Sequence, residues 1–154
     1  MNRLALFIAT CGYVGYVPVA PGTFGAAVGL VLLWAVRGVG YASLEVVVIL
    51  SLVGLGVWSA TVAEHHAGKT DPGIVVIDEA AGMLITMFLV PATTAALVVG
   101  FVLFRALDIL KPWPARRLER LQGGLGIMAD DIMVALYGNL AMHGLVAAAP
   151  GWFR

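Results

Sequence analysis

The sequence predicts an all-α fold, a multi-helix integral membrane protein, and two observations support this. First, 61% of the 154 residues are hydrophobic and only 12% are charged, whereas soluble domains average about 45–50% apolar and about 25% charged residues. Second, charge-free runs cover residues 4–36, 46–63, 80–104 and 132–153. A membrane-spanning helix needs about 20 such residues; the run 46–63 meets this need only marginally. The whole chain, 1–154, is expected to form one membrane domain.

The charge balance and the cysteine count exclude several other classes of protein. Nine Lys and Arg stand against nine Asp and Glu, so there is no basic excess that would bind a nucleic acid backbone, and no nucleic acid partner is expected. The single cysteine, Cys11, has no partner for an internal disulfide. So few charges also argue against an ordinary soluble globule, a disordered chain or a coiled coil.

The first half of the chain predicts a helical hairpin. Arg3 and the apolar residues after it resemble a signal peptide, but the apolar character continues past a short hydrophobic region without a clean cleavage site. This segment is therefore expected to be retained. A helix is predicted near 23–36, a short loop over 37–43, and a return helix near 44–63, because polar residues separate the two apolar runs.

Pro91 divides the third apolar run. Proline lacks a backbone N–H and restricts the residue before it, so a bend or hairpin is expected there. A short arm over 80–90 would measure about 16 Å at 1.5 Å per residue, roughly half of a bilayer. A helix over 92–108 would then return, and a last helix, near 129–148, would cross again.

This topology places most charged residues on one side of the membrane. The basic residues on that side are Arg3, Lys69, Arg105, Lys111, Arg116, Arg117 and Arg120, with Arg37 and Arg154 opposite. Because cytoplasmic loops carry an excess of Lys and Arg, the first side is predicted to be cytoplasmic. The acidic residues divide in the same way: Glu64, Asp71, Asp78, Glu79, Asp108, Glu119, Asp130 and Asp131 share that side, and Glu45 lies opposite.

Carboxylates at the boundaries of the apolar runs are the candidate catalytic residues. Acidic residues favour helix N-termini, which accounts for Asp78-Glu79 and Asp130-Asp131 without any function. It does not account for Asp108, at the end of its helix, although Arg105 is three residues away and able to pair with it. Several converging carboxylates would suit Mg²⁺. A metal-and-phosphate site is therefore favoured, and a purely structural charged rim is the alternative.

Other residues offer contacts for a phosphate. Lys111, Arg105 and the cluster Arg116, Arg117 and Arg120 supply cations. The loop 15–25, with Gly22 and Thr23 close to a helix N-cap, would form an anion-binding nest or simply a tight re-entrant loop. Within it begins a Gly25-x₃-Gly29 motif, which lets two helices approach closely, either inside one chain or in a homodimer.

Four motifs in order resemble the phosphatidylglycerophosphatase A family over about residues 12–138. They are Pro21-Gly22-Thr23-x-Gly25, Val76-Ile77-Asp78-Glu79-x₂-Gly82, Phe104-Arg105-x₂-Asp108-Ile-Leu-Lys111-Pro-Trp-Pro114 and Gly123-Gly124-x-Gly126-Ile127-Met128-x-Asp130-Asp131. Together they contain most of the carboxylates. The segment 60–75, with Glu64, His65, Lys69 and Asp71, matches the family less well.

The resemblance implies an Mg²⁺-dependent lipid phosphatase that converts phosphatidylglycerophosphate to phosphatidylglycerol and inorganic phosphate in the bacterial inner membrane, with its site facing the cytoplasm. Asp78, Glu79, Asp108, Asp130 and Asp131 would hold the metal. The catalytic set would be Asp78, Glu79, Arg105, Asp108, Lys111 and Asp131, and the substrate contacts Gly22, Thr23, Arg105, Lys111 and Arg116. Direct attack by water and a phosphoenzyme are both open. The alternatives are a phosphatase for another lipid phosphomonoester and a non-enzymatic membrane assembly protein.

Overall fold

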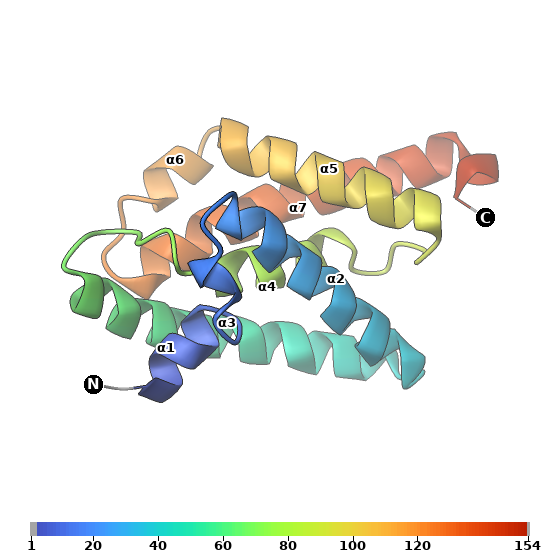
Figure 1. Ribbon diagram of the computed structural model, residues 1–154. Coiled ribbons are helices and arrows are strands. Elements are labelled where there is room, and N and C mark those ends of the chain that lie inside the picture. The colour runs from blue at the N-terminus through green and yellow to red at the C-terminus, as the bar shows by residue number, and fades with distance from the viewer. Residues whose placement is uncertain (1–2, 154) are drawn as a thin grey trace.

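The computed structural model describes residues 3–153, and the secondary structure of this part of the chain is helical throughout (Figure 1). Four long helices surround a shorter one. The long helices are α2 (Pro21–Gly38), α3 (Ala42–Ala67), α5 (Thr94–Leu110) and α7 (Gly124–Ala148), and the shorter one is α4 (Ile77–Thr86). The remaining elements are α1 (Arg3–Ala9), α6 (Ala115–Leu118) and two 3₁₀ turns, Val14–Tyr16 and Pro150–Trp152. The predicted all-helical fold is confirmed.

Three of the described helices are long and apolar enough to cross a membrane. They are α2, the segment Ser43–Ala67 of α3, and α7. All three were predicted, and each extends beyond its predicted bounds. The N-terminal extension of α7 is the largest: it begins at Gly124 rather than near residue 129, because the backbone N–H of Gly124 donates to the Thr61 side chain (2.8 Å) and so gains a partner on α3.

The half-length arm is α4, and it occupies the centre of the molecule (Figure 1). It has ten residues, about 15 Å of helix, and it packs against α2, α3, α5 and α7. The prediction placed the arm at 80–90, whereas the helix begins at Ile77 and ends at Thr86. A turn containing Pro91 then leads into α5, whose first turn is capped by the side chain of Thr93 (3.3 Å to the N–H of Ala96). The predicted hairpin near Pro91 is therefore present.

Side chains from two other helices bind carbonyl groups of the turn that follows α4. Arg37 of α2 donates to the carbonyls of Met87 (2.7 Å) and Val90 (2.6 Å), and Asn139 of α7 donates to Phe88 (2.8 Å). Arg37 is itself paired with the buried carboxylate of Glu45 (3.0 Å). The charged pair at this end of the molecule thus stabilises the end of the arm.

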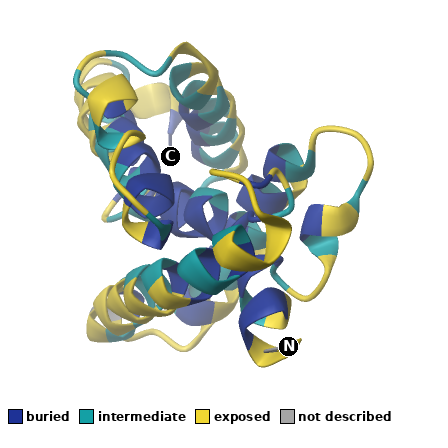
Figure 2. Ribbon diagram, turned by 90° about the vertical axis from the view of Figure 1, so that its left-hand side faces the viewer, coloured by how far each residue is buried: buried dark blue, intermediate teal, exposed yellow. Residues whose placement is uncertain are grey.

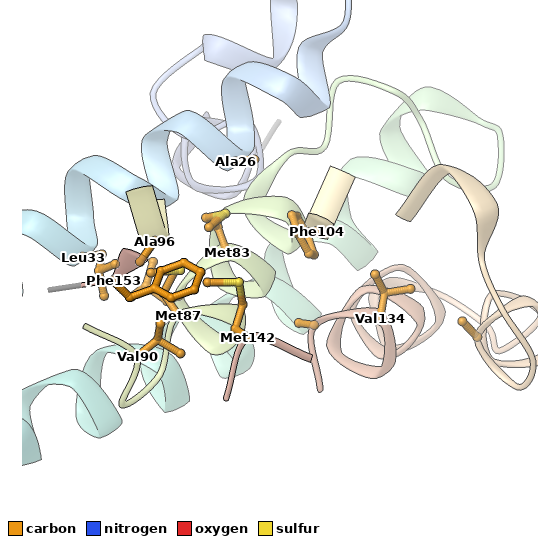
Figure 3. Close-up of a cluster of buried hydrophobic side chains, with 13 residues drawn as sticks. Ala26, Leu33, Met83, Met87, Val90, Ala96, Phe104, Val134, Met142 and Phe153 are labelled. Atoms are coloured by element: carbon orange, nitrogen blue, oxygen red, sulfur yellow. The ribbon is translucent and has the colours of Figure 1, made fainter. Parts of the chain in front are cut away.

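The core lies between α4 and the helices around it. Figure 3 shows Met83 of α4 and Met87, the residue after that helix, among Leu33 of α2, Ala96 of α5 and Met142 of α7. Figure 2 shows the buried residues where the helices meet and the exposed ones along their outer sides. Many of the exposed side chains are large and apolar, which suits helices that face lipid.

The Gly25-x₃-Gly29 motif brings α2 against α4 within one chain. A Cβ atom at Gly29 would lie 2.6 Å from the carbonyl oxygen of Ala80, and one at Gly25 would lie 2.8 Å from that of Val76. Both distances are shorter than a van der Waals contact, so only glycine permits this approach. The motif is used inside the chain, and a homodimer stays a prediction.

A matched pair of glycine substitutions tests this packing. Gly29→Ala is expected to lower the free energy of unfolding by about 1–3 kcal/mol, because α2 must move away from α4. Gly54→Ala is the control: it lies inside α3 with no atom within 4 Å of an added Cβ, and alanine gains up to about 1 kcal/mol from helix propensity. Thermal unfolding in detergent measures both. Equal midpoints for the two variants would contradict the close approach.

Candidate functional site

The charged residues divide between the two ends of the molecule as predicted. Figure 1 shows the starts of α2, α4 and α7, the ends of α3 and α5, and the whole of α6 at one end. Arg37 and Glu45 lie at the other end, where α2 leads into α3. Arg154, predicted to lie there too, falls outside the described residues.

A polar cavity of about 260 Å³ lies at the end where the charges gather. Its walls come from the start of α2, the loop before α4, the first turn of α4, the end of α5 and the first turns of α7. The residues that line it are Ala20, Pro21, Gly22, Asp71, Gly73, Val75, Asp78, Glu79, Arg105, Asp108, Lys111, Ile127, Asp130 and Asp131. The five predicted metal ligands are all among them.

Three of these carboxylates converge in the cavity. Asp78 and Glu79, from the first turn of α4, and Asp131, from the second turn of α7, each offer an oxygen within 4.8 Å of the others. Asp78 and Asp131 are only 8% and 3% exposed. One buried oxygen of each of the three carboxylates has no hydrogen-bond partner among the residues that the structure describes. Buried charges of like sign are costly unless a cation compensates them, so this cluster fits a divalent metal ion.

The other two predicted ligands are held by cations. Asp108 pairs with Arg105, three residues before it on α5, as the spacing predicted. Asp130 accepts a hydrogen bond from the ammonium of Lys111 at 2.6 Å through one oxygen, while its other oxygen is buried without a partner in the described chain. Asp108 also lies next to Asp131. Both residues therefore border the cluster of Asp78, Glu79 and Asp131.

Arg105 and Lys111 project into the cavity from the end of α5. One terminal nitrogen of Arg105 is shared between Asp108 and Glu79, the latter at 3.8 Å, and its Nε is buried and free of any partner in the part of the chain described. Lys111 ends the helix with a left-handed backbone (φ 42°) and lies between Asp130 and Glu119, the latter at 3.3 Å. Arg105 therefore keeps a donor available for an anion.

The surroundings of Lys111 keep its side chain protonated. Burial lowers the pKa of Lys111, but the hydrogen bond to Asp130 and the charges of Asp130, Glu119 and Asp131 raise it by more, so the net pKa lies above its ordinary value. The lysine is thus a permanent cation in the cavity.

The start of α2 differs from the prediction. The helix begins at Pro21, and its N-cap is Ala20 in a left-handed conformation, without a side-chain cap. Gly22 lines the cavity as predicted; a Cβ atom there would lie 2.1 Å from Glu79 Oε1 and 3.0 Å from the Arg105 guanidinium. Thr23 is in the first turn rather than at the N-cap, and it is not among the lining residues.

Two further groups of predicted residues lie away from the cavity. Arg116 is on α6 and donates to the carbonyl of Leu110 (3.1 Å), so it does not line the cavity. Glu64, His65 and Lys69 line a neighbouring cavity of about 430 Å³, next to Gly123. Of the weakly matching segment 60–75, only Asp71 reaches the carboxylate cavity among the residues named from the sequence.

Glu119 is the polar contact that the motifs did not single out. It lies just after α6, and its carboxylate is 3.3 Å from the ammonium of Lys111, which also binds Asp130. Its only signal in the sequence was its place among the carboxylates on the predicted cytoplasmic side. The fold of α6, which no periodicity in a four-residue helix could predict, brings it to the lysine.

A helical membrane protein with converging buried carboxylates and two cations in one cavity has the features of an enzyme that acts on a phosphorylated molecule at the membrane surface. Comparison with known proteins gives the family. Residues 7–146 match the family model for phosphatidylglycerophosphatase A, and the chain belongs to that family. It is therefore a lipid phosphatase, in the class of phosphoric monoester hydrolases.

Individual relatives agree with this assignment. Phosphatidylglycerophosphatase A of Escherichia coli (strain K12) is 36% identical over 124 residues, 79% of this chain and 72% of that protein. The Haemophilus influenzae protein of the same name is 34% identical over 136 residues, 85% and 82%. A Bacteroides thetaiotaomicron protein named "Putative phosphatidylinositol-3-phosphatase" is 33% identical over 143 residues, 87% and 88%. No solved structure matches the chain.

Proposed function

We propose that this protein hydrolyses phosphatidylglycerophosphate to phosphatidylglycerol and inorganic phosphate in bacterial phospholipid synthesis, with Mg²⁺ as its cofactor. One observation carries the proposal: Asp78, Glu79 and Asp131, each with a buried oxygen that has no partner among the described residues, line the same cavity as Arg105, whose Nε has no partner there either. Carboxylate oxygens are ligands that Mg²⁺ prefers, and guanidinium groups bind phosphate. The names of two relatives support the substrate.

The residues that line the cavity would have different roles in phosphate hydrolysis. Asp78, Glu79 and Asp131 would hold the metal, with Asp108 and Asp130 beside them. When bound, Mg²⁺ supplies Lewis-acid stabilisation of the charge on the phosphoryl oxygens. Arg105 binds the phosphate through its free Nε, and the protonated Lys111 adds positive charge where the transition state accumulates negative charge. Gly22, which has no side chain, lets Glu79 and Arg105 lie close to the backbone at the start of α2.

The location of the site supports an assignment to the bacterial inner membrane with the cavity facing the cytoplasm. The cavity lies at the end of the bundle that carries most of the Lys and Arg residues, and an excess of these residues marks the cytoplasmic side of membrane proteins. A cavity in this position would bind a phospholipid of the membrane.

Phosphate release by the purified protein in detergent tests the proposal. Release from phosphatidylglycerophosphate is expected with Mg²⁺ and is expected to stop with EDTA, then to return when Mg²⁺ is restored. Phosphate release that is unaffected by EDTA would contradict the proposal that the reaction depends on Mg²⁺. The assay should include phosphatidylinositol 3-phosphate, because the name of the Bacteroides relative favours it as a second candidate. A preference for that lipid would replace the proposed substrate and retain the reaction.

A further inference from the structure

The mouth of the cavity lies between the start of α2 and the loop before α4. Of the residues that line the cavity, Ala20, Asp71 and Gly73 are exposed, whereas the carboxylates of Asp78 and Asp131 are deep inside. The two sides of the mouth are held together at Gly15, where the backbone packs so closely on the Ile74 carbonyl that an added Cβ would overlap it. The mouth is therefore an opening between two loops that are in close contact at Gly15 and Ile74.

The two sides of this mouth differ in chemistry. One side, the segment 17–20, is Val-Pro-Val-Ala and carries no charge; we name it the apolar rim. Its Val19 is 73% exposed. The other side, the loop before α4, includes the exposed residue Asp71, which carries a carboxyl group. Such an asymmetry is expected at a boundary between lipid and water.

The turn next to the apolar rim carries aromatic side chains. Tyr13 and Tyr16 are exposed, with ring centroids 6.1 Å apart, and Tyr13 contacts Phe7 edge to face at 5.5 Å. Tyrosine is enriched where a membrane meets water, because its ring is apolar and its hydroxyl is polar. These residues place the apolar rim at the level of the lipid headgroups, independently of the cavity.

We infer that the apolar rim is the surface on which the substrate's glycerol backbone and the first methylene groups of its acyl chains lie while its phosphate is in the cavity. This inference rests on the proposed function. A lipid held by its phosphate next to Arg105 must leave the cavity through the mouth. Its acyl chains then lie along the uncharged side, since on the side of Asp71 they would lie beside a polar, water-exposed group. The apolar rim thus makes the enzyme selective for lipids over soluble phosphomonoesters.

Val19→Asn tests the inference, with Val39→Asn as the matched control. Val39 follows the other end of α2 and is 56% exposed, so it is far from the mouth along the same helix. Two substrates are compared: long-chain phosphatidylglycerophosphate in mixed micelles, and glycerol 3-phosphate, a soluble phosphomonoester without acyl chains. For Val19→Asn, the KM for the long-chain substrate is expected to rise about tenfold with kcat unchanged. The kinetics with glycerol 3-phosphate are expected to stay at the wild-type values, and Val39→Asn is expected to match wild type with both substrates.

The outcomes separate this inference from the proposed function. If the wild-type protein hydrolyses neither substrate, the proposed function fails. If it hydrolyses the lipid and Val19→Asn leaves the long-chain KM within about twofold, or raises the KM for glycerol 3-phosphate equally, only the inference about the apolar rim is overturned. If Val19→Asn does not fold, as judged by its thermal midpoint, Val19→Ser takes its place with the same expected split.

Discussion

Replacing Asp131 or Asp78 by Asn is expected to abolish phosphate release while the protein still folds and inserts in the membrane. Each substitution keeps the size of the side chain and removes one negative charge from the cluster in which the oxygens of Asp78, Glu79 and Asp131 lie within 4.8 Å of one another. Metal ions contribute several kcal/mol to transition-state stabilisation, and about 4 kcal/mol corresponds to about a 10³-fold loss of rate. Turnover in detergent with Mg²⁺ measures the effect.

A binding measurement distinguishes loss of the metal from loss of another function. Mn²⁺, followed by electron paramagnetic resonance, is expected to bind the wild-type protein and to bind both variants much more weakly. Glu64→Gln is the control, because Glu64 is a carboxylate at the same end of the molecule that lines the neighbouring cavity instead. Near-normal turnover in both Asp variants would overturn the metal assignment. Normal Mn²⁺ binding with lost turnover would assign these carboxylates a direct chemical role.

The helices could be predicted from the sequence because their signals are local. Long charge-free runs predicted α2, α3 and α7, and Pro91 predicted the hairpin between α4 and α5. The pair Arg105 and Asp108 followed from a spacing of three on one helix. The charge pattern also predicted which end of the bundle carries the site, since each apolar run reverses the direction of the chain.

The sequence could not predict which carboxylates converge and which pair with a cation, because this depends on tertiary packing. Asp130 and Asp131 are adjacent on α7, so their side chains point about 100° apart. One meets Lys111 and the other meets the first turn of α4. The rotation of α7 against α4 determines which of the two residues contacts Lys111 and which contacts α4. The position of α6 also matters, because it brings Glu119 to the same lysine. The spacing of residues in the sequence does not predict that rotation.

For a similar reason, only some of the residues predicted to contact the phosphate line the cavity. Gly22 and Thr23 are neighbours in the first turn of α2, and only Gly22 faces the cavity, because proline at the first helical position starts the helix earlier than predicted. Arg116 belonged to a basic cluster in the sequence, but α6 carries it outward, where it binds a carbonyl at the end of α5. Charge alone does not identify the arginine that contacts a phosphate.

Arg105→Lys is expected to reduce kcat/KM for phosphate release by about 10²–10³-fold, the usual loss when one preorganised donor to the transition state is removed. Lysine keeps the charge and retains the ion pair with Asp108 on the same helix, so the fold is expected to survive, with a thermal midpoint close to that of wild type. It has no Nε and no planar fork, so it lacks the separate donor that the guanidinium keeps free while it pairs with Asp108.

Arg116→Lys provides the comparison, because it makes the same chemical change outside the cavity. It is expected to leave kcat/KM nearly unchanged. If both variants lose activity equally, the basic cluster acts as a whole, and the unpartnered Nε of Arg105 has no special role. If only Arg105→Lys loses activity, and if it binds Mn²⁺ as wild type does, then the phosphate contact is separate from the metal cluster, although Arg105 and Glu79 lie only 3.8 Å apart.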